Sequence, residues 1–171
     1  LLLASEDAST TEFIKSSLAS LGCSLQIHRV SSLDDFKTML NQNDWDVVIG
    51  FASSFVFTPQ TIQSALDTHT TEVSKLYIDS HYTPNQALNV LQLGFSDYLL
   101  ETQAEMLSFA IVREATAIRS IRKAKVADAH IAEATAANHQ LLDSTSDAIA
   151  YLSDGMVVHA NRSFLNALAY D

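Results

Sequence analysis

Short apolar segments alternate with segments of helical periodicity over the first 118 residues, and this alternation constrains the fold more than any other feature. The predicted strands are 1–4, 23–30, 46–49, 76–78 and 98–100, and helices begin near Ser9, Ser31, Pro59, Pro84 and Gln103. Val47, Val48 and Ile49 form an unbroken apolar run, which is typical of a parallel strand covered on both faces. The pattern predicts an α/β fold, a doubly wound five-stranded parallel sheet with helices on both faces.

The segment from Gln103 to about Leu142 contains neither glycine nor proline and predicts one long α-helix. A helix of about forty residues extends about 60 Å, which exceeds the size of such a domain. Its second part follows a heptad pattern with small and apolar residues at the a and d positions, as in a two-stranded coiled coil. The residues predicted to form this dimer seam are Ile111, Ile118, Ile131, Asn138 and Leu141, with Asn138 fixing the register. The alternative is a single amphipathic helix that packs back on its own domain.

The last thirty or so residues change pattern again. Two short strands, 149–152 and 156–160, flank an Asp154-Gly155 turn, and a further helix begins at Asn161. Two strands and a helix are too few to close a core of their own. The sequence therefore predicts three parts: a domain over 1–118, a helical linker over 119–140, and a partial α+β segment over 141–171.

Charge and cysteine content exclude several classes of protein. The net charge of −10 argues against a nucleic-acid-binding protein, which needs a basic face to meet phosphates. The lone Cys23 excludes a disulfide framework and a cysteine-based zinc cluster, so we expect a cytoplasmic location. No apolar run approaches the roughly 20 residues that span a membrane, so no membrane insertion is expected.

The segment Gly94-Phe-Ser-Asp-Tyr-Leu-Leu100 is similar to the loop and fifth strand of receiver domains of two-component response regulators. The five strand–helix units resemble that family over about residues 1–118, which implies a flavodoxin-like fold. The resemblance also implies a phosphoryl-transfer site at the strand ends. In that site two acids hold Mg²⁺, an aspartate accepts the phosphoryl group, and a hydroxyl and a lysine contact its oxygens.

Most positions of that site carry a different residue in this chain. The matched positions are Ser5, Glu6, Phe51, Asp79, Tyr98 and Glu101. Phe51 stands at the acceptor position and cannot be phosphorylated, and Glu101 would repel the phosphoryl group that a lysine attracts. Asp79 replaces the hydroxyl, while Tyr98 keeps the aromatic residue. We therefore expect a non-enzymatic module without catalytic residues, cofactor or metal, in which Phe51 fills the former site.

Three alternatives remain open at this point. Glu6, Asp79 and Glu101 together offer the oxygen ligands that a divalent cation prefers. An unconventional acceptor, Asp79 or Asp7, would make the domain a working phosphorelay receiver. A small-ligand sensor would use the altered pocket for a metabolite.

The stretches 142–155 and 160–165 resemble the beginning of a PAS domain. A degenerate receiver, a helix and a PAS opening in this order resemble FimX-like proteins, which continue into GGDEF and EAL domains of cyclic di-GMP signalling. The resemblance implies a regulatory homodimer that binds other signalling proteins.

Overall fold

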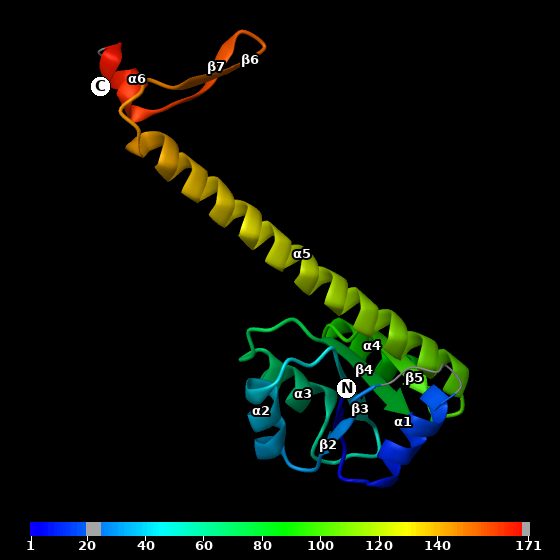
Figure 1. Cartoon of the computed structure of the whole chain (residues 1–171). Coiled ribbons are helices and arrows are strands. Elements are labelled where there is room, and N and C mark those ends of the chain that lie inside the picture. The colour runs from blue at the N-terminus through cyan, green and yellow to red at the C-terminus, as the bar shows by residue number, and fades with distance from the viewer. Residues whose placement is uncertain (20–24, 169–171) are drawn as a thin grey trace. The chain divides into compact units, whose positions relative to one another are not determined.

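The computed structural model describes residues 1–19 and 25–168, and the chain divides into two compact units, Leu1–Arg122 and Lys123–Asp171 (Figure 1). The first unit ends four residues after the predicted boundary at 118. Cys23 and the predicted helix end at Gly22 lie outside the described residues.

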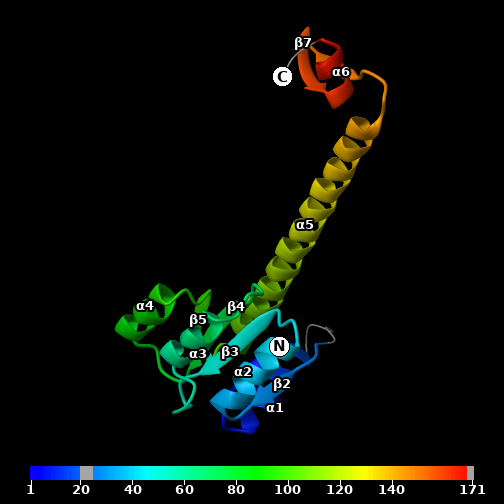
Figure 2. The same cartoon turned by 90° about the vertical axis from the view of Figure 1, so that its left-hand side faces the viewer.

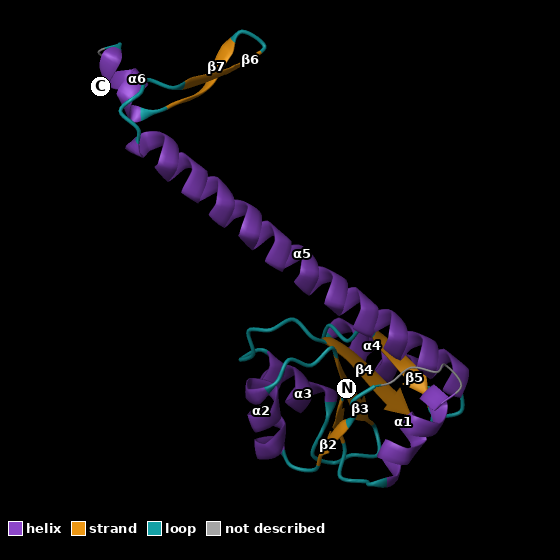
Figure 3. Cartoon of the chain, in the orientation of Figure 1, coloured by secondary structure: helices purple, strands orange, loops and turns teal. Residues whose placement is uncertain are grey.

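The first unit contains a five-stranded parallel sheet in the order β2-β1-β3-β4-β5 (Figure 3). The strands are β1 (Leu2–Ala4), β2 (His28–Val30), β3 (Val47–Phe51), β4 (Ser74–Asp79) and β5 (Asp97–Leu100). The helices are α1 (Ser9–Ala19), α2 (Leu33–Gln42), α3 (Pro59–Leu66), α4 (Pro84–Gln92) and α5 (Ala104–Ser144). The predicted flavodoxin-like sheet with flanking helices is confirmed. Of the predicted strand 23–30, residues 23 and 24 lie outside the described residues, and among 25–30 only His28–Val30 pair with the three residues of β1.

Two apolar cores lie on opposite faces of this sheet (Figures 1 and 2). Successive side chains of a strand point to opposite faces, so β3 places Ile49 in one core and Val48 in the other. The first core is closed by α1 and α5, and the second by α2, α3 and α4. Every residue of β3 is buried, in agreement with its unbroken apolar sequence.

The first part of α5 belongs to the first unit. Ile111 is 0% exposed and lies in the core with Leu107 and Ala110, and Ile118 is 9% exposed. The prediction that Ile111 and Ile118 contribute to a dimer seam is therefore wrong. The apolar residues of a coiled-coil helix and those of a helix packed on a sheet repeat with periods that differ by only about a tenth of a residue per turn. Two turns of sequence are too few to distinguish these two kinds of packing.

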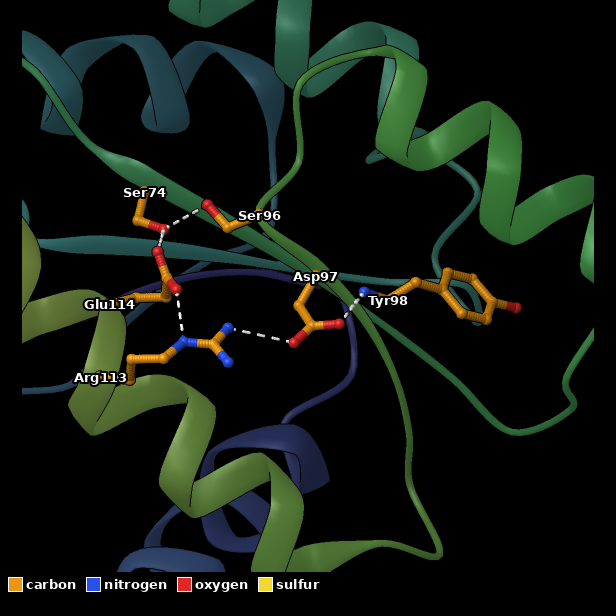
Figure 4. A network of polar contacts seen from close by, with 6 residues as sticks. All are labelled: Ser74, Ser96, Asp97, Tyr98, Arg113 and Glu114. Atoms are coloured by element: carbon orange, nitrogen blue, oxygen red, sulfur yellow. Dashed lines mark hydrogen bonds and ion pairs between the residues drawn. The ribbon is translucent and has the colours of Figure 1, made fainter.

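Polar contacts tie the same part of α5 to β4 and β5 (Figure 4). The Glu114 carboxylate accepts hydrogen bonds from the Ser74 hydroxyl at 2.7 Å and from Arg113 Nε at 2.8 Å. Arg113 also pairs with Asp97 at 3.1 Å, and the hydroxyls of Ser74 and Ser96 lie 2.8 Å apart. The network holds α5 against the strands at the edge of its apolar stripe.

The last turn of α5 within the first unit is anchored by two arginines. Arg119 and Arg122 both pair with Asp46, at 2.7 Å and 3.3 Å. Arg122 Nη2 also donates to the carbonyl oxygens of Trp45 at 2.5 Å and Glu72 at 2.6 Å, just before β3 and near the start of β4. The helix is therefore fixed to the sheet up to the residue at which this unit ends.

The second unit contains the rest of α5, an antiparallel pair β6 (Ala150–Ser153) and β7 (Met156–Ala160), and α6 (Arg162–Ala167). Asp154 and Gly155 have φ values of 49° and 79°, as their turn requires. The buried Asn161 joins these elements. Its Oδ1 accepts from the N–H groups of Ile149 and Phe164, both at 2.9 Å, and its Nδ2 donates to the carbonyl oxygen of Leu142 at 2.9 Å.

No helix among residues 1–19 and 25–168 is long and apolar enough to cross a membrane.

The two environments of isoleucine along α5 predict different costs of truncation. Ile111→Ala removes a fully buried side chain and should lower the free energy of unfolding by about 2–5 kcal/mol. Ile121→Ala, at a position 43% exposed on the same helix, should cost less than about 1 kcal/mol. Urea denaturation followed by circular dichroism measures both, and equal losses would contradict the assignment of Ile111 to this core.

Glu114 should contribute to the acid sensitivity of the protein. Burial by itself raises the pKa of its carboxyl, but the hydrogen bonds from Ser74 and Arg113 outweigh that effect and the pKa lies below its usual 4.5. Its stabilising contribution is therefore complete above pH 4.5 and is lost as the pH falls through the lowered folded-state pKa.

Glu114→Gln should therefore lose about 1 kcal/mol at pH 7 and show a flatter loss of stability below pH 4.5 than the parent. Denaturant unfolding between pH 7 and pH 3 measures this, with Glu133→Gln, at an exposed position on the same helix, as the control. Parallel curves for the parent and Glu114→Gln would contradict the assignment.

Candidate functional site

Five of the six residues of the predicted pocket lie at the carboxyl ends of the strands, and the sixth, Tyr98, lies within β5 and reaches this edge through its hydroxyl. Ser5 and Glu6 follow β1, Phe51 ends β3, Asp79 ends β4, and Glu101 follows β5. Asp79 pairs with Leu100 in the register of β4 and β5, and the Glu101 N–H donates to the Asp79 carbonyl oxygen at 2.9 Å. In open parallel sheets this edge is where ligands and chemistry are found.

Phe51 is part of the apolar core and offers no group to this edge. Its side chain is 1% exposed and lies in the same core as Ile14 of α1, Ile78 of β4 and Leu107 of α5. A carboxylate buried at this position would need a hydrogen-bond donor or a cation beside it. The surrounding side chains of the core are apolar and offer neither.

Two of the predicted site residues, Asp79 and Tyr98, are joined by a short hydrogen bond. The Tyr98 hydroxyl donates to Asp79 Oδ2 at 2.6 Å, and the His81 N–H donates to Asp79 Oδ1 at 3.1 Å. Both carboxylate oxygens of the buried Asp79 are thus occupied by donors of the protein. The bond from Tyr98 connects β5 to the carboxyl end of β4, and the bond from His81 connects that end to the loop between β4 and α4.

Aromatic rings surround the Tyr98 phenol. The Tyr77 ring stacks beside it with centroids 6.4 Å apart, and Tyr82 meets it edge-on at 6.2 Å. Burial raises the pKa of Tyr98, and its hydrogen bond to Asp79 raises that pKa further. Burial also raises the pKa of Tyr77 to about 12. Tyr98 therefore remains a neutral donor to Asp79 at any physiological pH.

Glu6 holds the loop between β3 and α3. The Ser54 hydroxyl donates to Glu6 Oε2, and the Val56 N–H donates to Oε1 at 3.2 Å. The same Ser54 oxygen accepts from the Phe57 N–H at 2.9 Å, and the hydrogen bond from Ser54 is the main reason that the pKa of Glu6 is lowered. Ser5 is buried, and its hydroxyl oxygen accepts from the Asp7 N–H at 3.1 Å.

The acids of this edge do not gather around a common point. Among residues 1–19 and 25–168, no group of three or more His, Cys, Asp or Glu side chains is arranged to hold a metal ion. Glu6 serves the β3–α3 loop and Asp79 is bound by Tyr98. The alternative of a divalent cation shared by Glu6, Asp79 and Glu101 therefore lacks the ligand cluster that it requires.

Sequence reasoning did not anticipate Ser54 or His81 at this site. Ser54 stands in a run of small and aromatic residues with no recognisable motif, and only the folding of its loop brings it to Glu6. His81 contributes its backbone N–H, a group that every residue except proline carries, so its identity gives no signal.

No protein-family model and no curated protein matches this sequence. Solved structures of receiver domains do match its fold. The signal receiver domain of a putative LuxO repressor protein from Vibrio parahaemolyticus superposes with a TM-score of 0.62 at 14% identity, covering 72% of this chain and 94% of that one. The receiver domain of a Francisella response regulator gives 0.57 at 16% identity, covering 67% and 94%.

A putative pilus assembly-related protein from Burkholderia pseudomallei gives a TM-score of 0.55 at 18% identity, covering 67% of this chain and 87% of that one. Likeness at such identities concerns the fold. The sheet and flanking helices of the first unit therefore have the architecture of response-regulator receiver domains, and its site must be judged from its own residues.

The Asp79–Tyr98 bond predicts a measurable cost of removing one hydroxyl. Tyr98→Phe leaves a buried carboxylate short of a donor and should lower the free energy of unfolding by about 1.5–3 kcal/mol. Tyr151→Phe, at an exposed position in β6, should change it by less than about 0.5 kcal/mol. Urea denaturation at pH 7 measures both, and an unchanged stability of Tyr98→Phe would show that the bond is absent in solution.

Proposed function

We propose that the first unit is a receiver-like signalling domain that works without phosphorylation. The observation that carries this proposal is the burial of Phe51 in the apolar core, at the position where a receiver has its acceptor aspartate. The nearby acids support it, because Asp79 and Glu6 already accept hydrogen bonds from the protein. A domain of this kind is non-catalytic and takes its input from the binding of another signalling protein.

The output of the domain runs through α5. The helix is tied to the sheet by its apolar stripe, by Glu114 and by Arg122, so a change in the sheet moves the helix with it. The exposed second part of α5 dimerises, and a change in the geometry of the dimer is the transmitted signal.

The segment after α5 provides the connection to further domains. Its hairpin and α6 follow the order of elements with which PAS domains open, and the resemblance to FimX-like proteins suggests GGDEF and EAL domains downstream. The chain is then the regulatory part of a cytoplasmic protein of cyclic di-GMP signalling, with no role in binding nucleic acid.

A phosphorelay receiver with an unconventional acceptor is the second candidate, and the exposure of Asp7 favours it. Asp7 follows β1 at the same edge of the sheet, and its carboxylate accepts from the Ser9 N–H at 2.8 Å and the Ser9 hydroxyl at 2.7 Å. Asp79 is the weaker acceptor because its side chain is buried, whereas Asp7 is exposed to solvent; the carboxylate oxygens of both residues accept hydrogen bonds from the protein.

Phosphoryl analogues distinguish these functions. Beryllofluoride or acetyl phosphate with Mg²⁺ should leave the amide NMR spectrum of the full chain unchanged, because Phe51 offers no carboxylate and the acids among residues 1–19 and 25–168 form no cluster that could hold the cation. A conventional receiver domain under the same conditions serves as the positive control. Shifts of amides in the β1–α1 loop that disappear in Asp7→Asn would establish phosphorylation at Asp7 and overturn the proposal, and the same result with Asp79→Asn would do so for Asp79.

A further inference from the structure

Beyond Arg122, α5 exposes three large apolar side chains, of which Ile131 and Leu141 lie on one face and Val126 lies on another. Ile131 is 65% exposed and Leu141 is 67% exposed, whereas the isoleucine at position 111 of the same helix is fully buried. Burial of such a side chain contributes about 1.5–3 kcal/mol of favourable free energy, which is not gained while the side chain faces water. The helix beyond Arg122 therefore has an apolar face that the described residues of the second unit leave uncovered.

Ile131 and Leu141 fall on the a and d positions of one heptad frame that begins after Arg122, while Val126 falls on an outward c position. Ala124, Ile131 and Asn138 occupy its a positions, and Ala127, Ala134 and Leu141 its d positions. We call these six residues the seam. The seam excludes Ile111 and Ile118, which belong to the core of the first unit.

The hairpin of the second unit contacts α5 away from the seam. The ring of His139 lies 4.5 Å from the ring of His159 in β7, and Asp143 Oδ1 accepts from the Arg162 N–H at 3.2 Å. Positions 139 and 143 are the b and f positions of the heptad, which lie on the side of a helix opposite to a and d. The hairpin thus packs on the outer face of α5 and leaves the seam accessible.

The charges beside the seam indicate what covers it. Lys123 stands at a g position and Asp128 at the e position five residues later. In a parallel in-register pair, a g residue meets the e residue of the next heptad in the other chain, so each Lys123 meets Asp128 of the second copy. An antiparallel pair brings e to e and g to g instead, and it separates the two Asn138 side chains that would otherwise bond across an a layer.

We propose that residues 123–141 of α5 bind a second copy of this chain as a parallel, in-register two-stranded coiled coil. The proposal rests on the dimerisation included in the function above and specifies its orientation, register and starting point. Because Arg122 is tied to the carbonyl groups of Trp45 and Glu72, the coil begins directly where the helix leaves its domain.

Disulfide trapping tests the orientation and the register. In the full chain with Cys23→Ser, Asn138→Cys should form an intermolecular disulfide under mild oxidation, because equivalent a positions face each other only in a parallel in-register coil. The matched control is Ala136→Cys, two residues away at an outward f position, which should cross-link at least ten-fold more slowly. Equal rates for the two variants, or no cross-link at 138 in a dimeric protein, would overturn the proposal.

Charge reversal tests the same geometry without a new covalent bond. Lys123→Glu and Asp128→Lys should each raise the dissociation constant of the dimer about two- to ten-fold, because each homodimer then contains two like-charged pairs. An equimolar mixture of the two variants restores opposite charges at both contacts and should regain the parent affinity as a heterodimer. Analytical ultracentrifugation measures this, and a mixture no tighter than its components would contradict the predicted contacts.

Failure of this inference is distinguishable from failure of the proposed function. A dimer with a different orientation changes the cross-linking and mixing results but leaves the response to beryllofluoride unaltered. A parent chain that stays monomeric at about 100 μM would overturn the coiled coil itself. Phosphorylation at Asp7 would overturn the proposed input while the coil could still form as described.

Discussion

The burial of β3 on both faces is the constraint on which the rest of the first unit depends. Val47–Phe51 lies at the middle of the sheet order and supplies side chains to both cores, so every helix of the unit packs directly or indirectly against it. Phe51 ends this apolar strand at the carboxyl edge of the sheet, and its side chain is buried in the first core. The proposal that the domain works without phosphorylation depends on this large apolar side chain, because it stabilises the core and offers no group to a phosphoryl donor.

The acids at the carboxyl edge of the sheet illustrate how polar groups adapt to such a change. The buried carboxylate of Asp79 needs donors and receives them from Tyr98 and His81. The exposed carboxylate of Glu6 accepts hydrogen bonds from Ser54 and Val56. These bonds connect the β4–α4 and β3–α3 loops to the strands. Internal hydrogen bonds thus fix both loops at the carboxyl edge of the sheet.

Helix α5 shows how one periodicity serves two different packing partners. Up to Arg122 its apolar stripe meets the sheet, and Glu114, Arg119 and Arg122 hold it there. Beyond Arg122 a similar stripe stays exposed, and its charges fit a second copy of the chain. The anchored part of the helix is a rigid extension of the domain, so the dimer we propose would respond to the state of the sheet.

The sequence by itself determined the order of strands and helices, the parallel sheet and the residues that reach its carboxyl edge, because local periodicity and strand spacing depend on near neighbours in the chain. It also determined that Phe51 cannot accept a phosphoryl group, since that follows from its chemistry. Only the tertiary structure decided which part of α5 packs on its own domain, because a sheet and a second helix select the same spacing of apolar residues. Only the fold showed that Ser54 and Tyr98 satisfy Glu6 and Asp79, because these pairs are separated by 48 and 19 residues and meet through loop geometry that no local pattern encodes.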